Sequence, residues 1–152
     1  MAAAIARTLI KDGALGSSAS KWTARSAGVG AADGSPATHE AVLAVRRLGA
    51  SLSDHRSRRL TADLTRKADL ILTMSPWHAH AARQIDPSAD QRIIPLSPFG
   101  EIPDPIGQGQ ETYDRTADEL KWLIDWRLKQ FRDGVIFSGD APPPLSPPPH
   151  AR

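Results

Sequence analysis

The stretch Ala68–Met74, apolar except for Asp69 and Thr73, constrains the fold of this chain more than any other sequence feature. It is short, rich in Leu and Ile and preceded by charged residues, a pattern typical of a strand buried on both faces of a parallel sheet. Ser75-Pro76 follows directly, and a serine followed by proline is a preferred helix start. A strand that leads straight into a helix indicates an α/β fold.

Further segments continue this alternation of strands and helices. Two more strands are predicted at Trp22–Ala27 and Arg92–Leu96. The helices predicted from apolar periodicity and capping residues are Met1–Lys11, Thr38–Gly49, a short one beginning at Thr61, one opened by Ser75-Pro76, and Gln110–Arg132. Phe99–Gly109 is interrupted by Pro and Gly and predicts an irregular loop. The sequence therefore predicts one three-layer α/β/α domain over residues 1–137.

The last segment, Ser138–Arg152, differs in composition from the rest of the chain. It contains two runs of three prolines, which cannot continue a helix or a sheet. We expect a disordered tail over residues 138–152. An inert tail or a linker remnant is favoured over a polyproline ligand, because nothing in the segment adds specificity.

Composition excludes several classes of function. The chain has 152 residues and no cysteine, which rules out disulfides, thiolate metal sites and cysteine-based catalysis by the chain as written. A formal net charge of +2 gives little support to a nucleic-acid partner. No apolar run approaches membrane length, so we expect a cytoplasmic protein without a membrane partner. A transit peptide at Met1–Ser20 is possible but less favoured than a buried helix.

The first predicted helix, Met1–Lys11, has no capping residue in front of it. A helix of this apolar character normally begins after Ser, Thr or Asp. The interpretation that follows is that the sequence starts at an internal position of a longer protein.

Three separated segments of the chain each match part of a known protein family. They are Ser26–Val29 (SAGV), His55–Thr61 (HRSRRLT) and Pro103–Pro105 (PDP). Each is weak alone. In this order, and with these intervening helices, they resemble the low-molecular-weight protein tyrosine phosphatase family, in particular its arginine-phosphatase branch.

The resemblance implies a fold and a missing part. Members of the family have a four-stranded parallel sheet whose first, interior strand ends in a phosphate-binding loop of the form Cys-x5-Arg-Ser. Met1–Ala6 resembles the register just after that loop. The resemblance thus implies that the first strand, the cysteine nucleophile and the phosphate-binding arginine are absent from this chain.

The resemblance also assigns roles to residues that are present. Asp104 matches the family's general acid, which protonates the leaving group. His55 and Ser26 match residues that support the phosphate loop. Without the resemblance, Asp104 would be interpreted as a turn aspartate, because Asp-Pro is a common turn pair. His78 and His80 diverge on a predicted helix, so no metal site is predicted, and no cofactor is expected.

The function implied is hydrolysis of phosphotyrosine or phosphoarginine in proteins through a phosphocysteine intermediate. Ile106-Gly107 stands where tyrosine phosphatases of this family often place aromatic residues, which favours the arginine branch. The expected partner is a phosphorylated protein. As written, the chain is expected to be inactive, and a non-catalytic binding module or a decayed fragment of the same fold remain the alternatives.

Overall fold

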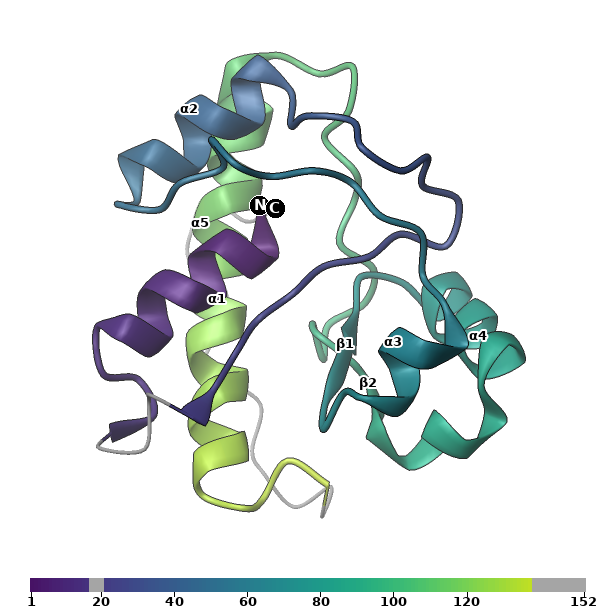
Figure 1. The fold of residues 1–152 in the computed structure, drawn as a ribbon. Helices are drawn as coiled ribbons and strands as arrows, with labels where there is room; N and C mark the ends of the chain where they lie inside the picture. Colours follow the sequence, from purple (N-terminus) through teal and green to yellow (C-terminus); the bar gives the residue numbers. More distant parts are fainter. Residues whose placement is uncertain (17–20, 138–152) are drawn as a thin grey trace. The chain divides into compact units, whose positions relative to one another are not determined.

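The computed structural model describes residues 1–16 and 21–137, so the predicted tail lies outside the described residues. The chain divides into two compact units (Figure 1). The first unit contains Met1–Ser26, Pro36–His55 and the described residues from Asp104 onward, and the second contains Ala27–Ser35 and Arg56–Pro103. A single domain over residues 1–137 stays a prediction.

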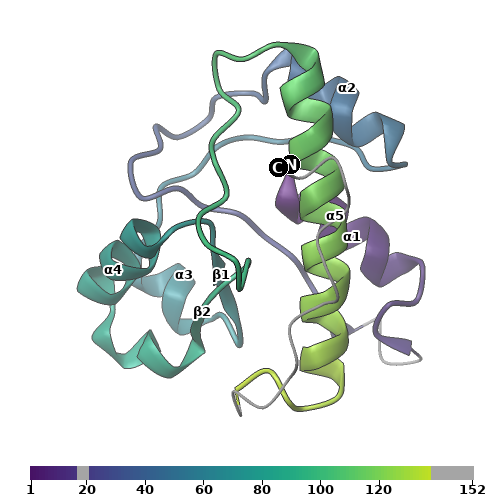
Figure 2. The same cartoon turned by 180° about the vertical axis from the view of Figure 1, so that it is seen from behind.

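Three helices make up most of the first unit: α1 (Ala2–Lys11), α2 (His39–Arg47) and α5 (Gln110–Arg132). Both α1 and α2 pack against α5, as the two opposite views show (Figures 1 and 2). The predicted apolar stripe of α5 is buried at Tyr113, Ala117, Leu120, Ile124 and Leu128. Burial of this stripe explains why so long a helix forms, since packing of one apolar face provides most helical stability.

Local signals set the ends of these helices. The hydroxyl of Thr38 accepts a hydrogen bond from the Ala41 N–H at 3.2 Å and caps α2, as predicted. At the N-terminal end of α1, Met1 occupies the N-cap position and makes no side-chain capping hydrogen bond.

Polar contacts fix α2 to α5. The Arg47 guanidinium lies 2.8 Å from Asp118 and also donates to the Asp114 carbonyl at 3.1 Å. The Gln110 amide donates to the Glu40 carbonyl at 3.1 Å. The start of α5 is therefore held by directional bonds in addition to apolar packing.

The second unit is built around two parallel strands, β1 (Ile71–Thr73) and β2 (Ile93–Pro95). Their register pairs Ile71 with Ile93 and Thr73 with Pro95. The chain enters β1 from α3 (Ala62–Arg66) and passes from β1 to β2 through α4 (Pro76–Ile85) and the 3-10 helix η2 (Pro87–Arg92). This strand–helix–strand connection confirms the predicted α/β class.

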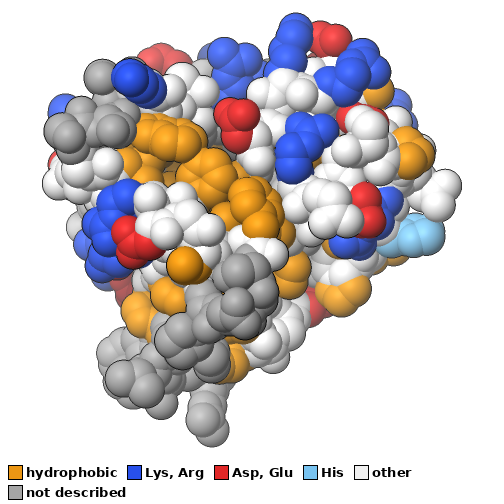
Figure 3. Space-filling model, turned by 90° about the horizontal axis from the view of Figure 1, so that it is seen from below, with side chains coloured by type: hydrophobic (Ala, Val, Ile, Leu, Met, Phe, Trp, Pro, Cys, Tyr) orange, Lys and Arg blue, Asp and Glu red, His pale blue; other side chains and the backbone are white. Residues whose placement is uncertain are grey.

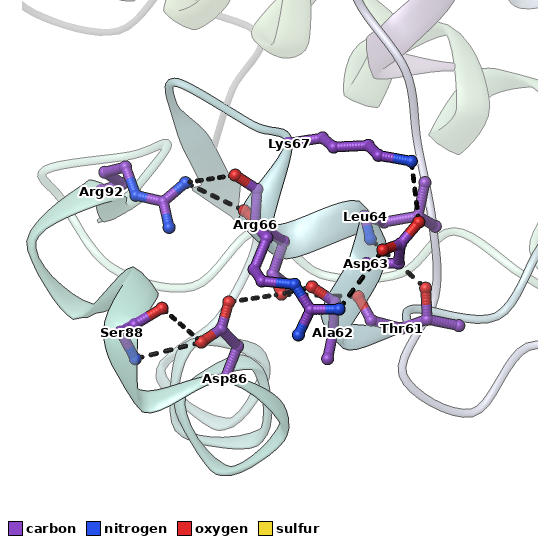
Figure 4. A network of polar contacts seen from close by, with 10 residues as sticks. Thr61, Ala62, Asp63, Leu64, Arg66, Lys67, Asp86, Ser88 and Arg92 are labelled. Atoms are coloured by element: carbon purple, nitrogen blue, oxygen red, sulfur yellow. Dashed lines mark hydrogen bonds and ion pairs between the residues drawn. The ribbon is translucent and has the colours of Figure 1, made fainter.

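The apolar core of the second unit is small, and polar contacts supplement it. Ala79, Ala82, Ala89 and Ile93 form the buried cluster. Beside it, Asp86 connects α3 to η2 (Figure 4). Leu60 and Ile71 pack against this cluster, and Leu96 and Ile102 are also buried in this unit, so apolar packing and these hydrogen bonds both stabilise it.

Two strand predictions need correction. Trp22–Ala27 forms no strand, and its neighbour Gly28 makes only an isolated parallel bridge with Arg59. Strand assignment requires a backbone ladder, which residues 22–27 lack among the described residues. The strand predicted at Ala68–Met74 is limited to three residues and is half-buried at Ile71 and Leu72, so it is not buried on both faces. The described residues thus contain a two-stranded sheet.

The length and composition of the described helices show whether any could span a membrane. None of those within residues 1–16 and 21–137 is both long and apolar enough to cross one.

Candidate active site

Asp104 lies at the start of an exposed loop that leads to α5. Its carboxylate oxygen Oδ1 accepts a hydrogen bond from the Ile106 N–H at 3.0 Å, which closes a turn between the side chain and the backbone. Asp104 is exposed, and its other carboxylate oxygen has no hydrogen bond to any described residue. One oxygen is therefore held by the backbone, while the second has no hydrogen-bond partner among the described residues.

A second turn follows at once and presents Ile106. The Gln108 N–H donates to the Pro105 carbonyl at 2.9 Å, and Gly107 has φ +77°. A positive φ at the third position is characteristic of a type II turn and requires glycine or asparagine there. The Ile106 side chain is 67% exposed at the tip of this turn.

The segments on both sides of this loop are anchored. Before it, the Ile102 N–H donates to the Met74 carbonyl at 2.9 Å, just beyond the carboxyl end of β1. After it, Gln110 bonds to Glu40 in α2. Ile102 belongs to the second unit and Gln110 to the first, so the loop that carries Asp104 connects the two units along the chain.

The two other predicted site residues belong to the same unit as Asp104. His55 is half-buried and its backbone N–H donates to the Leu52 carbonyl at 3.1 Å, whereas Ser26 is exposed. Each of the three residues stands at an end of one of the stretches that compose the first unit. Among the described residues, Ser26 and Asp104 are not hydrogen-bonded to each other.

The residues that follow Ser26 and His55 are joined to each other within the second unit. The Ser57 hydroxyl donates to the Ala32 carbonyl at 2.5 Å and accepts from the Ser35 N–H at 3.0 Å. Asp33 accepts from the Arg59 N–H at 2.7 Å. Backbone hydrogen bonds join the same segments, from the Gly28 N–H to the Arg58 carbonyl at 3.0 Å and from the Gly34 N–H to the Ser57 carbonyl at 2.8 Å. Side-chain and backbone bonds together therefore fix one segment against the other.

The positioning role of Asp33 and Ser57 was missed in the sequence. Asp33-Gly34-Ser35-Pro36 predicts a turn cluster, but nothing in its spacing names the partner segment. Bonds from a turn to a distant segment depend on tertiary structure, which a local motif does not encode.

The described residues contain no group of three or more His, Asp or Glu side chains that could hold a metal ion. His78 is instead engaged at the start of α4, where its ring nitrogen Nδ1 lies 2.8 Å from the Ser75 hydroxyl.

Comparison with known proteins decides the family. Residues 1–133 match the family described as low molecular weight phosphotyrosine protein phosphatase. The chain belongs to this phosphatase family. It is 33% identical over 107 residues to a low molecular weight protein-tyrosine-phosphatase of Acinetobacter johnsonii, across 68% of this chain and 75% of the relative. It is also 34% identical over 106 residues to a protein-arginine-phosphatase of Geobacillus stearothermophilus, across 66% and 71% respectively.

Solved structures of phosphatases support the same assignment. The arginine phosphatase from Geobacillus stearothermophilus superposes with a TM-score of 0.72 and 27% identity, covering 87% of this chain and 86% of that one. Wzb from Vibrio vulnificus, in complex with benzylphosphonate, gives a TM-score of 0.69 and 26% identity over 88% and 87%. These superpositions confirm the α/β phosphatase fold predicted from the sequence.

Proposed function

We propose that this chain is part of a protein phosphatase that removes phosphate from tyrosine or arginine side chains. Asp104 is its general acid. The observation that carries the proposal is the Asp104 turn, which holds one carboxylate oxygen and leaves the other accessible. Asp104 lies within the residues matched to the phosphatase family. The protein's partner is then a phosphorylated protein, and the cytoplasm is the expected location.

The chemistry assigns a defined step to Asp104. In a cysteine-type phosphatase a thiolate attacks phosphorus, and the bond from phosphorus to the substrate oxygen or nitrogen breaks. Asp104 donates its proton to that leaving atom and then accepts one from the water that hydrolyses the phosphocysteine. Because the 152 residues contain no cysteine, the thiolate must be supplied by residues outside them.

His55 and Ser26 have a supporting role in this proposal. Neither is proposed as a base. Their proposed role is to orient the phosphate-binding loop, which agrees with their match to the family's segments.

Phosphoarginine is the favoured substrate class. Ile106 presents a mainly exposed aliphatic side chain directly after the Asp-Pro pair, where an aromatic ring would flank a phosphotyrosine. Relatives include protein-arginine-phosphatases of Geobacillus stearothermophilus and Bacillus subtilis. Relatives named as tyrosine phosphatases keep phosphotyrosine as the second candidate.

The test compares the 152-residue chain with a version extended at its N-terminus by a strand and a Cys-x5-Arg-Ser loop of the family's form. The unextended chain should give no turnover above a mock preparation. The extended chain should hydrolyse phosphoarginine peptides faster than phosphotyrosine peptides. Asp104→Asn should lower its rate by about 10²- to 10⁴-fold on a substrate with a poor leaving group.

Asp12→Asn provides the matched control, because Asp12 is exposed at the end of α1 and has no part in the proposed chemistry. Equal single-turnover rates for the extended chain and its Asp104→Asn variant would assign the acid elsewhere. A folded extended chain that binds phosphopeptides without turnover would instead favour the binding-module alternative.

A further inference from the structure

Gln110 is the first residue of α5 and directly follows the loop that carries Asp104. Its half-buried side-chain amide nitrogen donates to the Glu40 carbonyl of α2 at 3.1 Å and to the Asp114 carboxylate at 2.9 Å. Both partners are acceptors, so only the NH2 group of the amide fits there, and both of its hydrogens are used. Gln110 therefore makes a directional link between α2 and the start of α5.

Two hydrogen-bonded turns connect this link to the carboxylate of Asp104. The Ile106 N–H donates to the carboxylate at 3.0 Å, and the Gln108 N–H donates to the Pro105 carbonyl at 2.9 Å. A single residue separates the second turn from α5. A shift of the start of α5 would therefore move the carboxylate.

The entry into α5 has no local side chain that fixes it. Gly109 occupies the N-cap position and makes no side-chain capping hydrogen bond. Gly107 and Gly109 both lack a Cβ, so the backbone between Asp104 and α5 has more conformational freedom than other residues would give it. Such an entry needs a contact from elsewhere in the fold, and Gln110 supplies one.

The other polar contact between α2 and α5 lies later in α5 and is more exposed. The Arg47 side chain donates to the Asp114 carbonyl at 3.1 Å and lies 2.8 Å from Asp118, where it is 44% exposed. Exposed ion pairs contribute little. Within the described stretch 104–110, only Gln110 has a side-chain hydrogen bond to α2.

We propose that Gln110 is a positioning residue for the general acid Asp104. It ties the start of α5 to α2 and so holds the acid loop relative to α5, the helix against which α1 also packs (Figures 1 and 2). In the extended chain described above, the loop with the nucleophile directly precedes α1. The inference rests on the proposed function, since proton transfer needs the acid within hydrogen-bond reach of the leaving atom.

Gln110→Met is the variant that tests this role. Methionine has a similar length and helix propensity but deletes both donors. Gln84→Met makes the same change at an exposed position of α4 in the second unit and is the matched control. Hydrophobic side chains already reach the surface on the face shown in Figure 3, so one further methionine changes the surface little.

Two substrates of the extended chain separate positioning from a general loss of structure. Phenyl phosphate releases a phenol with a pKa of about 10, so its cleavage depends strongly on the acid. Para-nitrophenyl phosphate releases a more acidic phenol and depends on the acid less. Gln110→Met should slow single-turnover phosphoryl transfer about 10-fold with phenyl phosphate and less than about 2-fold with para-nitrophenyl phosphate. Equal slowing of both would indicate a merely structural role and overturn the inference.

Asp104→Asn in the same extended chain separates failure of this inference from failure of the proposed function. If Asp104→Asn slows the reaction of phenyl phosphate and Gln110→Met does not, the acid stands and the positioning role is overturned. If Asp104→Asn leaves both rates unchanged, the acid lies elsewhere, and both proposals are overturned.

The 152-residue chain gives a readout that needs no activity. Backbone NMR relaxation reports the order of the Ile106 and Gln108 N–H groups, which close the two turns. Gln110→Met should lower their order parameters from about 0.85, the value of rigid backbone, toward about 0.6, and Gln84→Met should not. Unchanged values in Gln110→Met would show that the turns are held without this side chain, and loss of amide protection along all of α5 would show a structural role. Either result would overturn the inference.

Discussion

Two Asp-Pro pairs in this chain make the same hydrogen bond, from the backbone N–H two residues later to the aspartate side chain, and differ in the structure that follows and surrounds it. Asp86 accepts a hydrogen bond from the Ser88 N–H at 3.1 Å, just as Asp104 accepts one from the Ile106 N–H at 3.0 Å. Asp86, however, is only 6% exposed and also accepts from the hydroxyls of Ser88 and Thr65 at 2.6 and 3.0 Å. The Asp-Pro pair determines the turn. The surroundings of the turn determine whether both carboxylate oxygens are hydrogen-bonded or one is left without a partner among the described residues.

The electrostatics follow from this difference. The Ser88 hydroxyl is the main cause that lowers the pKa of Asp86 below its ordinary value of 3.8, and the Thr65 hydroxyl and the Ser88 N–H contribute while partial desolvation opposes them. Asp86 is therefore a charged, structural group at neutral pH. A proton donor for catalysis needs an accessible oxygen, which only Asp104 of these two residues has.

The largest effect on stability is expected for Arg92, whose guanidinium bonds to the end of α3, the helix that carries Thr65 (Figure 4). Its Nη1 donates to the carbonyls of Thr65 at 2.9 Å and Ala68, where α3 ends. Arg92→Met should lower the free energy of unfolding by about 1.5 to 3 kcal/mol, because hydrogen bonds from a charged donor are lost. Urea unfolding followed by circular dichroism measures this difference.

Arg83→Met is the matched control for Arg92→Met. Arg83 forms an exposed ion pair with Asp90 in the same unit, and such pairs contribute about 0 to 1 kcal/mol. Equal losses in the two variants would show that charge in general, rather than the carbonyls at the end of α3, explains the effect.

A smaller effect is expected when the donor to Asp86 is removed. Thr65 is 1% exposed, and Thr65→Val keeps its shape while deleting the hydroxyl. The free energy of unfolding should fall by about 1 to 2 kcal/mol. In an Asp86→Ala background the same change should cost clearly less, since the two side chains act as a pair. Additive losses would separate Thr65 from the stabilisation of the Asp86 turn.

Lowering the pH should destabilise the turn formed by Asp86. Because the folded-state pKa of Asp86 is lowered, its contribution is fully present above 3.8 and is lost as the pH falls below 3.8 toward the lowered value. The protection factors of residues 86–92, which correct for the intrinsic pH dependence of amide exchange, should therefore fall in this acidic window. Asp86→Asn should reduce this pH dependence without abolishing it, because the pKa of Asp63 in the same unit is also lowered by its bond to Lys67. An unchanged acid response would remove Asp86 from this explanation.

The comparison of the two turns also shows what sequence reasoning could achieve. Helices α2, α3 and α4 begin next to Thr38, Thr61 and Ser75, as predicted, because capping is a local contact. The bounds predicted for α5, Gln110–Arg132, match the structure. Strands were predicted less well, since a strand is defined by a partner elsewhere in the chain.

The candidate site follows the same division. Asp104 was found through a family resemblance, and its turn could be predicted from the Asp-Pro pair alone. The role of Asp86 was missed, although Asp86-Pro87 is the same pair and opens η2. Burial separates the two aspartates, and burial depends on tertiary packing that the dipeptide does not contain.

The smallest effect on stability is expected at Asp104 itself. It is exposed and holds a single backbone N–H, so Asp104→Ala should change the free energy of unfolding by no more than about 0.5 kcal/mol. The contrast with Asp86→Ala, measured in the same urea titration, is the sharpest test of the two turns. If Asp104→Ala destabilised the chain as much as Asp86→Ala, its carboxylate would be structural, and the loss of rate expected for Asp104→Asn in the extended chain would no longer identify an acid. A stable Asp104→Ala variant makes that loss of rate attributable to proton transfer, because the fold that presents the carboxylate is then unchanged.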